Sequence, residues 1–233
     1  ADFLKEVYYL DTHFKNIDPN FPFVKTDNIQ KIASKVTLLA QETLSDTLAL
    51  LEHDNLQKAL RIMQKANQIH LAAISYSLLL GQIFKLDMLR IGKNVNICNT
   101  NGEELFLPAV IKNNDCIIII SYSGEIHNLC SLARTLKGRS VPIIAITSLG
   151  DNELKKYADV VLHISTREKL YSKIAGYSNE NSIKLILDIL YSCYFNLMYD
   201  DNLARRIAIS KQAEVGREST LEIMKEDNTQ SGT

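Results

Sequence analysis

Two short serine-rich segments carry the side chains that are best suited to bind an anion. The first segment is SYS at residues 75–77, and the second is SYSGE at residues 121–125. Each follows an apolar run and opens a stretch with helical spacing. The start of a helix offers unpaired N–H groups and a positive partial charge, serine hydroxyls add donors, and Gly124 lets a ligand approach the backbone closely. If the two segments face each other, they meet the needs of a phosphate monoester.

The elements that must position these segments are five short apolar runs, which alternate with helical patterns. Strands are predicted at Ile69–Ile74, Val95–Cys98, Cys116–Ser121, Pro142–Thr147 and Val160–Ile164. Helices are predicted at Ala1–Phe14, Ile29–Leu51, Leu56–Ala66, Leu78–Ile91, Glu103–Lys112, Ile126–Lys137, Glu153–Tyr157, Ser182–Tyr199 and Leu203–Met224. Continuously apolar strands separated by helices are typical of a parallel sheet that is covered on both faces. The predicted fold class is therefore α/β, a three-layer αβα sandwich with a five-stranded parallel sheet and a helical N-terminal extension.

The order of the five strands decides whether the serine segments meet. Right-handed crossovers leave few topologies, and the flavodoxin-like order 2-1-3-4-5 fits five strands. This order puts the switch point between the first and third strands, where the two serine segments would face each other. Each segment alone also fits an ordinary helix N-cap, but two of them at these positions favour a binding site. The chain has no G-x-G-x-x-G motif after the first strand and no G-x-x-x-x-G-K-[ST] motif.

Composition and charge exclude several other classes of protein. The 233 residues include 26 Lys and Arg against 27 Asp and Glu, a formal net charge of −1, which disfavours nucleic-acid binding by this chain alone. No apolar run approaches the ~20 residues of a membrane span, and the N-terminus lacks the pattern of a signal peptide. The four cysteines are widely spaced, with no C-x-x-C. We therefore expect a soluble, cytoplasmic protein with buried reduced cysteines and with no metal or cofactor.

Local signals predict where helices and strands begin and end. Asp27, with Gln30 three residues later, fits a capping box at the start of a long amphipathic helix. Gly92 and Gly138 stand where helix C-caps are expected, and Pro142 stands at the first residue of a strand. The stretch from Asn16 to Lys25, which precedes this long helix, contains two prolines and no periodicity, so we predict a linker there.

Three stretches of the chain resemble a known family. IIIISYSG at 117–124, TSLGDN at 147–152 and REKLYSKIAGYSNENSI at 167–183 are similar to the sugar isomerase (SIS) domain of RpiR-type transcriptional regulators. The resemblance extends from about Asp27 to the end of the C-terminal helices. It implies an N-terminal helix-turn-helix domain, a linker and a SIS domain that senses a phosphorylated sugar. It also implies that Ser77, Ser121 and Ser123 contact the phosphate.

The chain departs from the family pattern at a few points. Ala73 and Ser75 stand where the family's first loop usually has the two glycines of G-x-G-x-S. Ile126 stands where the family often has a threonine, and Glu125 is close to where a dianion would lie. We therefore expect a site that is altered, weaker or tuned to another ligand, with Ser75 as a replacement for one lost donor.

Charged residues near the predicted site have alternative interpretations. Glu168 stands where SIS isomerases carry a catalytic glutamate; in a sensor it would bind a sugar hydroxyl, or it is a plain helix-start carboxylate. His127 is close enough to contact a ligand, but a solvated position on its helix is favoured. Arg167, Lys169 and Lys173 are candidates for a cation at the phosphate, although such runs are usually solvated. The predicted ligand-binding residues are Ser75, Ser77, Ser121, Ser123, Gly124, Glu125 and Glu168.

We therefore expect the effector-sensing domain of a bacterial transcriptional regulator and not an enzyme. Residues 1–26 would be the remnant of a helix-turn-helix domain and linker, 27–224 the SIS phosphosugar-binding domain, and 225–233 a flexible tail. DNA would be bound only through the missing N-terminal domain, and no membrane partner is expected. The alternatives are an aldose–ketose phosphosugar isomerase, with Glu168 and His127 as base and acid, and an interaction protein that has lost its ligand. The stretch 78–89 is apolar on more than one helix face, which favours a homodimer or tetramer.

Overall fold

Strands and helices alternate along most of the chain. The computed structural model describes residues 17–98, 102–216 and 218–225. Its strands are β1 (Ile69–Ala72), β2 (Val95–Ile97), β3 (Cys116–Ser121), β4 (Ile143–Thr147) and β5 (Val160–His163). Its α-helices are α2 (Ile29–Leu50), α3 (His53–Lys65), α4 (Ser75–Arg90), α5 (Leu107–Val110), α6 (His127–Gly138), α7 (Tyr177–Asn196) and α8 (Tyr199–Ala213). Short 3₁₀ turns lie at Glu103–Leu105, Leu154–Lys156 and Glu222–Met224. The helix predicted at Ala1–Phe14 lies outside the described residues.

The five strands form one parallel sheet in the order β2-β1-β3-β4-β5. Strand β1 pairs with β3 so that Ile69 lies opposite Cys116 and Ala72 lies opposite Ile119. Strand β3 is buried along its whole length, because β1 and β4 flank it and helices cover both faces. The predicted α/β fold and the strand order 2-1-3-4-5 are confirmed.

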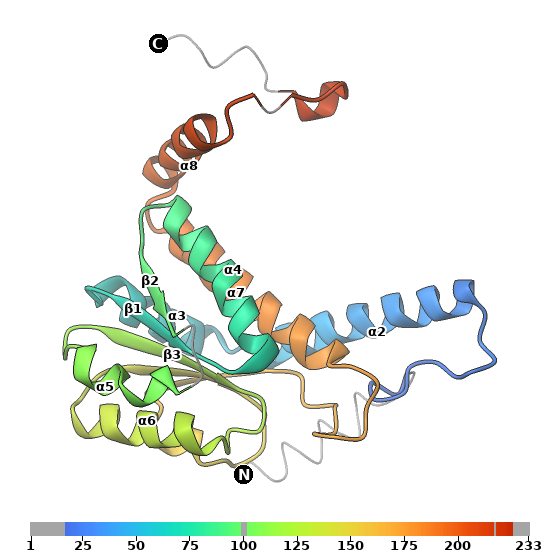
Figure 1. The fold of residues 1–233 in the computed structure, drawn as a ribbon, viewed down its shortest axis with the longest axis horizontal. Helices are drawn as coiled ribbons and strands as arrows, with labels where there is room; N and C mark the ends of the chain where they lie inside the picture. Colours follow the sequence, from blue (N-terminus) through green and yellow to red (C-terminus); the bar gives the residue numbers. More distant parts are fainter. Residues whose placement is uncertain (1–16, 99–101, 217, 226–233) are drawn as a thin grey trace.

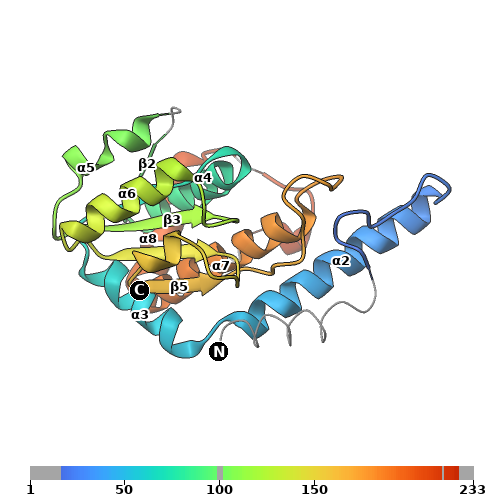
Figure 2. The same cartoon turned by 90° about the horizontal axis from the view of Figure 1, so that it is seen from below.

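Helices form the two outer layers of the molecule (Figure 1 and Figure 2). Helices α3, α4 and α7 pack on one face of the sheet, against alternate strand residues such as Leu71, Ile118 and Ile146. Helices α5 and α6 pack on the other face, against residues such as Ile119 and Ala145. Each large aliphatic side chain that is fully buried in these two cores contributes roughly 1.5–3 kcal/mol. The layers are those of the predicted three-layer sandwich.

Helix α2 projects beyond the sheet at its N-terminal end, as Figure 1 and Figure 2 show. It packs on α7 through pairs of hydroxyls. Thr43 Oγ1 lies 2.7 Å from Ser178 Oγ, and Thr47 Oγ1 donates to Ser182 Oγ at 2.8 Å. All four side chains are buried, so these bonds satisfy hydroxyls that water does not reach. Residues 17–28, which we call the N-terminal segment, lead into α2.

The cap of α2 is one residue later than predicted. The side chain of Asn28 accepts the N–H of Lys31 at 2.9 Å. The carboxylate of Asp27 instead accepts from the N–H of Val24 at 3.0 Å and from Lys35 at 2.6 Å. Asn and Asp suit the N-cap position equally well, so residue type alone did not distinguish them.

The C-terminal part of the chain contains less helix than predicted. Helix α8 ends at Ala213, whereas the prediction continued it to Met224. Gly216 has a φ of +82°, and this left-handed conformation does not continue a right-handed helix. Gly92 has a left-handed φ of +79° and follows Ile91, the C-cap residue of α4, so the predicted C-cap is one residue away. After α6 this conformation falls on Ser140, with a φ of +59°, and not on the predicted Gly138.

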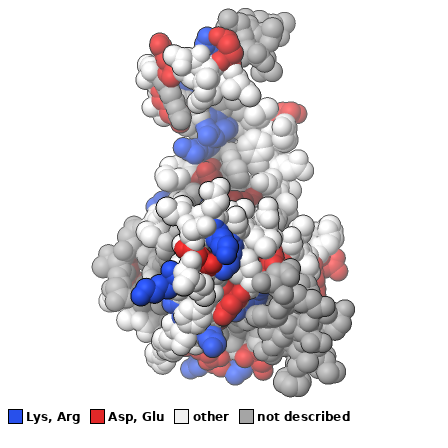
Figure 3. All heavy atoms as spheres, turned by 90° about the vertical axis from the view of Figure 1, so that its right-hand side faces the viewer, with Lys and Arg blue, Asp and Glu red and all other residues white. Residues whose placement is uncertain are grey.

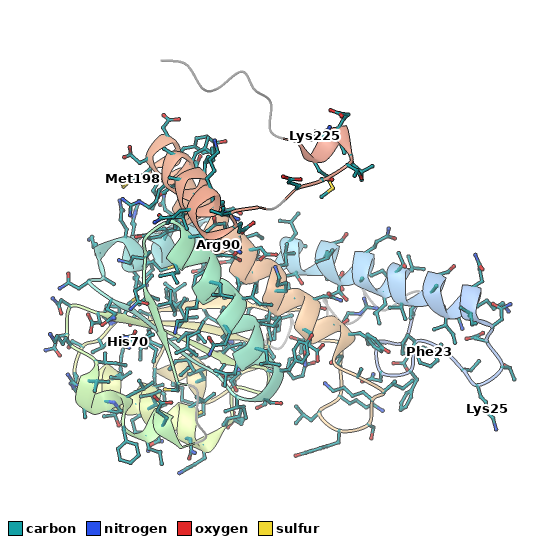
Figure 4. All side chains as sticks on the ribbon, turned by 45° about the horizontal axis from the view of Figure 1, so that its top comes forward. Phe23, Lys25, His70, Arg90, Met198 and Lys225 are labelled. Atoms are coloured by element: carbon teal, nitrogen blue, oxygen red, sulfur yellow. The ribbon has the colours of Figure 1, made fainter. Side chains whose placement is uncertain are left out.

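A histidine is buried in the middle of the sheet, as Figure 4 shows. Nε2 of His70 lies 3.3 Å from Oδ2 of Asp115. Its Nδ1 has no hydrogen-bond partner among the described residues. Burial lowers the pKa of His70, and the nearby Asp115 opposes this effect only in part. The folded protein therefore favours the neutral imidazole.

We expect His70 to make the protein less stable as the pH falls below about 6.5, the ordinary histidine pKa. Below this pH the unfolded chain binds a proton that the buried imidazole resists. Acid therefore favours unfolding, by at most about 1.4 kcal/mol per pH unit for one proton. Urea unfolding between pH 5 and 8 measures the slope, which His70→Gln should reduce. His53→Gln, at an exposed position, is the control, and a slope unchanged in His70→Gln would contradict the prediction.

The cysteines are free thiols. Cys98, Cys116 and Cys130 are buried, as predicted, and Cys193 is half-buried. Burial raises the pKa of Cys116 to about 12, which makes it a poor nucleophile. Among the residues that the structure describes, no group of three or more His, Cys, Asp and Glu side chains is placed to hold a metal ion. Within the same ranges, no helix has the length and apolar character needed to cross a membrane.

Candidate functional site

The two serine segments leave neighbouring strands at the same edge of the sheet. Strands β1 and β3 are parallel, and Ala72 at the end of β1 lies opposite Ile119. Ser75 follows Ala72 by three residues, and Ser121 and Ser123 follow Ile119 by two and four residues. The first segment forms the first turn of α4, and the second leads into α6. The first serine turn (residues 75–77) and the second serine turn (residues 121–125) therefore lie at the switch point between β1 and β3, where ligands bind in such sheets.

The first serine turn has an unusual backbone. Helix α4 begins three residues earlier than predicted, so Ser75 and Ser77 both lie in its first turn. The N-cap residue is Ile74, whose side chain makes no capping hydrogen bond to this helix start. Ser75 has a φ of +53°, in the left-handed region that favours glycine. The G-x-G-x-S pattern has its second glycine at this position, so Ser75 combines a glycine-like backbone with an exposed hydroxyl.

Replacing Ser75 by glycine is expected to stabilise the protein by about 1 kcal/mol. The reason is that a left-handed φ costs serine about this much and costs glycine little. Replacing Ser77, the third residue of the same helix, by glycine should have the opposite effect, a loss of up to about 1 kcal/mol. Urea unfolding of both variants measures whether the free energy of unfolding rises in Ser75→Gly and falls in Ser77→Gly. A loss of stability in Ser75→Gly would contradict this account of the turn.

The second serine turn is held by its own hydroxyls. Ser121 Oγ accepts the N–H of Gly124 at 3.1 Å, and Ser123 Oγ accepts the N–H of Glu125 at 3.2 Å. A hydroxyl that accepts a hydrogen bond keeps its own proton to donate. Helix α6 starts at His127 with no side-chain cap, so its first N–H groups add further donors. The turn therefore offers positioned donors and no competing acceptor from a cap.

Gly124 is a point of close approach between the second serine turn and the loop after β4. It has a φ of +69°, and a Cβ there would lie 2.1 to 2.6 Å from three side-chain atoms of Asn152. Asn152 is itself held in place. Its Nδ2 donates to Thr147 Oγ1 and to the carbonyl of Gly150, and its Oδ1 accepts the N–H of Lys155, each at 3.2 Å. The TSLGDN stretch therefore packs against the second serine turn at Gly124 and helps to fix its position.

Glu125 and His127 lie on the outer side of the second serine turn. The Oε1 of Glu125 accepts the N–H of Glu153 at 2.9 Å, so this side chain fastens the turn to the loop after β4. A direct contact between Glu125 and a ligand stays a prediction. His127 is exposed at the first position of α6, which confirms the solvated interpretation.

Glu168 is enclosed by the protein. Its side chain has 0% exposure, and Oε2 pairs with Nζ of Lys173 at 2.7 Å. Its Oε1 accepts the N–H of Ser178 and, at 3.2 Å, the N–H of Asn179. The carboxylate therefore caps the start of α7, as the helix-start interpretation predicted. The predicted contact of Glu168 with a sugar hydroxyl would require these bonds to open.

The basic residues beside Glu168 do not form a solvated run. The side chain of Arg167 has 0% exposure, and its two terminal nitrogens lie 3.0 Å from Glu42 Oε2 and 3.4 Å from Asp46 Oδ2. Lys173 binds Glu168 and lies over the ring of Tyr122, 5.4 Å from its centre. For Arg167 the solvated interpretation was wrong, because carboxylates within the fold compensate its charge. Lys169 is exposed, as the solvated interpretation had it.

The sequence reasoning missed two positioning residues, Tyr122 and Asn152. The hydroxyl of Tyr122 donates to the carbonyl of Glu168 at 2.7 Å and accepts its N–H at 3.0 Å. Tyr122 stands at the variable position of S-x-S-G, and Asn152 ends the TSLGDN stretch. Both residues therefore lay within motifs that had been noticed. Their roles depend on contacts with residues far away in the chain, which no local pattern reports.

Charge is mixed on the face of the molecule toward which α2 projects. Among the described residues of this face, Figure 3 shows Lys and Arg side chains interspersed with Asp and Glu and with uncharged residues. A surface that grips a phosphate backbone would present a continuous basic patch. The described residues visible on this face do not form one, in agreement with the net charge of −1.

Comparison with solved structures finds the same fold in proteins of more than one kind. The chain is similar to the Vibrio vulnificus NanR protein complexed with ManNAc-6P, at 17% identity and a TM-score of 0.72, over 79% of this chain and 71% of that one. It is similar to the sugar isomerase domain of an RpiR transcription factor from Sphaerobacter thermophilus, at 16% identity and a TM-score of 0.69, over 78% of this chain and 99% of that one. It is also similar to the phosphoheptose isomerase GmhA from Neisseria gonorrhoeae, at 14% identity and a TM-score of 0.62, over 72% of this chain and 100% of that one.

The family follows from a separate comparison. Residues 62–191, more than half of the chain, match the model of the SIS domain family. The match spans all five strands and both serine turns. Together with the parallel sheet and its strand order, this match establishes that the chain belongs to the SIS domain family.

Proposed function

We propose that this chain is the effector-sensing domain of a bacterial transcriptional regulator, which binds a phosphorylated sugar and controls an attached helix-turn-helix domain. The sensing domain would span residues 27–224 and act in the cytoplasm. Residues 1–26 would be the link to the DNA-binding part, and 225–233 a tail. No cofactor or metal takes part in this proposal.

The observation that carries the proposal is the placement of the two serine turns at one switch point of the sheet. The first turn opens α4 and the second leads into α6, and neither N-cap residue makes a side-chain capping bond, so the start of a helix and serine hydroxyls lie together in each turn. We propose that Ser75, Ser77, Ser121 and Ser123 donate to the phosphate while Gly124 lets it approach the backbone. Glu125 and Glu168 would shape the sugar side of the site. A protein of this fold, NanR, has been solved in complex with the phosphorylated sugar ManNAc-6P, which supports this ligand class.

The state of Glu168 favours a sensor over an isomerase. A catalytic base has to reach the proton that it removes. The carboxylate of Glu168 is instead buried and held by Lys173 and by the N–H groups of Ser178 and Asn179. It stabilises the start of α7, which is a structural task.

Calorimetry with a panel of hexose, hexosamine and pentose phosphates tests the ligand class. We expect one or more of them to bind, and we expect the variant Ser121→Ala/Ser123→Ala to lose at least tenfold in affinity, because each lost donor to a charged group costs about 1.5–3 kcal/mol. Ser131→Ala, at an exposed position on α6, is the matched control. If no sugar phosphate binds, or if the double variant binds as tightly as the wild type, the proposal fails.

A coupled aldose–ketose isomerase assay separates the sensor from the enzyme. We expect no turnover above that of the Glu168→Gln variant for any sugar phosphate that binds. Turnover that depends on Glu168 would instead support the isomerase alternative.

An apolar stripe on α4 supports a homodimer. Tyr76, Leu79, Ile83, Leu86 and Leu89 are all exposed large apolar residues at spacings of three and four, which puts them on one side of the helix. The opposite side of α4 is buried in the core, as the apolar character of stretch 78–89 on more than one face predicted. Figure 4 shows Arg90, which ends α4, at the same end of the molecule as Met198, another exposed apolar residue. We propose that a second copy of the chain covers this stripe.

Light scattering after size-exclusion chromatography tests the homodimer. Leu79→Glu/Leu86→Glu should give a monomer. Leu170→Glu, at a similarly exposed apolar position outside α4, should behave as the wild type. A monomeric wild type would contradict the proposal.

A further inference from the structure

Residues 167–169, which follow β5, together contact the second serine turn, the N-terminal segment and α2. Glu168 binds the second serine turn through its peptide group. The hydroxyl of Tyr122 donates to the carbonyl of Glu168 at 2.7 Å and accepts the N–H of Glu168 at 3.0 Å. Tyr122 stands between Ser121 and Ser123, so a shift of either serine has to move it. The peptide of Glu168 therefore follows the serine turn.

The residues on either side of Glu168 hold the N-terminal segment. The N–H of Lys169 donates to Oδ1 of Asn20 at 2.7 Å, and the N–H of Ile174 donates to the carbonyl of Asn20 at 2.9 Å. The guanidinium of Arg167 donates to the carbonyl of Ile17 at 3.2 Å. Asn20 is buried, so water does not compete for these bonds. Figure 4 shows Phe23 and Lys25, which follow Asn20, near the outer end of α2 and far from the sheet.

The same stretch also binds α2 directly. Arg167 contacts Glu42 at 3.0 Å and Asp46 at 3.4 Å, and Oε1 of Glu168 accepts the N–H of Ser178. Ser178 in turn shares its hydroxyl with Thr43 of α2. These hydrogen bonds and ion pairs are directional and buried. We therefore expect the stretch 167–169, α2 and the start of α7 to move together.

We propose that residues 167–169 couple occupancy of the serine turns to the N-terminal segment and α2, with Tyr122 as the positioning residue at the start of this link. An anion that draws the hydroxyls of Ser121 and Ser123 toward it displaces Tyr122, and Tyr122 carries the peptide of Glu168. The neighbouring Lys169 then moves Asn20. This inference rests on the proposed function, since it requires an anion to bind at the serine turns.

Hydrogen exchange without ligand tests the mechanical link on its own. In the full chain, Tyr122→Phe removes both bonds to the peptide of Glu168 and keeps the ring that lies beneath Lys173. We expect the amides of Lys169 and Ile174 to exchange at least tenfold faster in this variant. The control is Tyr171→Phe in the same loop, because Tyr171 is 91% exposed and should leave exchange unchanged. Unchanged exchange in Tyr122→Phe would overturn the inference.

Hydrogen exchange with inorganic phosphate, with calorimetry in parallel, tests the response to an anion. In the wild type we expect phosphate to change exchange of the Lys169 and Ile174 amides at least threefold. At phosphate concentrations that calorimetry shows to saturate each protein, Tyr122→Phe should show no such change. Binding to the wild type with no change in exchange overturns the coupling and leaves the proposed function intact. Absence of binding counts against the proposed function, and the ligand-free comparison still decides whether Tyr122 holds the N-terminal segment.

Discussion

Gly124→Ala is expected to destabilise the protein by about 2–5 kcal/mol and to reduce binding of any phosphorylated ligand at least a hundredfold. The left-handed φ of +69° costs an alanine about 1–2 kcal/mol. The added Cβ would lie 2.1 Å from Cγ of Asn152, which forces the second serine turn away from the loop after β4 at a further cost of about 1–3 kcal/mol. Urea unfolding and calorimetry measure the two effects.

Two further variants separate the causes of this loss. Gly150→Ala is the matched control, because Gly150 belongs to the supporting loop, has no positive φ and has no atom within 4 Å of an added Cβ. It should behave almost as the wild type. Asn152→Ala removes the three clashing atoms together with the hydrogen bonds of Asn152, so we compare backgrounds: Gly124→Ala should cost less stability in the Asn152→Ala background than in the wild type, and the cost that remains is the part due to φ. Equal stability of Gly124→Ala and Gly150→Ala would refute the role of Gly124.

Arg167→Met is expected to destabilise the protein by about 3–5 kcal/mol. Removing one partner from a buried ion pair leaves the other charge without compensation inside the protein. Here the carboxylates of Glu42 and Asp46 would lose the guanidinium, and the carbonyl of Ile17 would lose a donor. Urea unfolding at neutral pH measures the loss.

Two further variants test whether the loss in Arg167→Met comes from the unpaired buried carboxylates. Arg167→Met/Glu42→Met replaces both members of one pair by apolar side chains and should recover at least about 1 kcal/mol relative to the single variant. Arg90→Met removes a more exposed pair with Asp87 and should cost less than about 1 kcal/mol. A loss in Arg167→Met no larger than that in Arg90→Met would show that the cluster after β5 is not an important part of the fold.

Most of the sheet could be predicted from the sequence, because continuous apolar runs have few alternatives. The limits of β3 agreed with the prediction, since its six residues run from Cys116 to Ser121 without a polar interruption. The ends of helices were harder to place, because Asp27 and Asn28 have nearly equal capping preferences. The start of α4 was missed because Ser75 has a left-handed φ, which residue type disfavours for serine.

The site was predictable only in part. Serine hydroxyls and a glycine at two strand ends indicated an anion site, and the topology places both turns at one edge. The functional expectations that attach to these residues stay proposals. By contrast, no local pattern indicated that Arg167 is buried, because its partners stand as many as 150 positions away in the chain. The partners of the Glu168 carboxylate are nearer in the chain, but they come together only through the irregular loop before α7, which has no periodicity to read.

By itself, the order of residues determined which segments become strands, which turns carry hydroxyls, and the class of ligand that such turns suit. These properties are local, since they depend on side-chain type and on spacing within one element. The folded arrangement decided which charges stay available to a ligand. Burial and ion pairing remove Glu168 and Arg167 from solvent and join them to Tyr122 and α2. Such pairing depends on distances through space, which a linear pattern of residues does not contain.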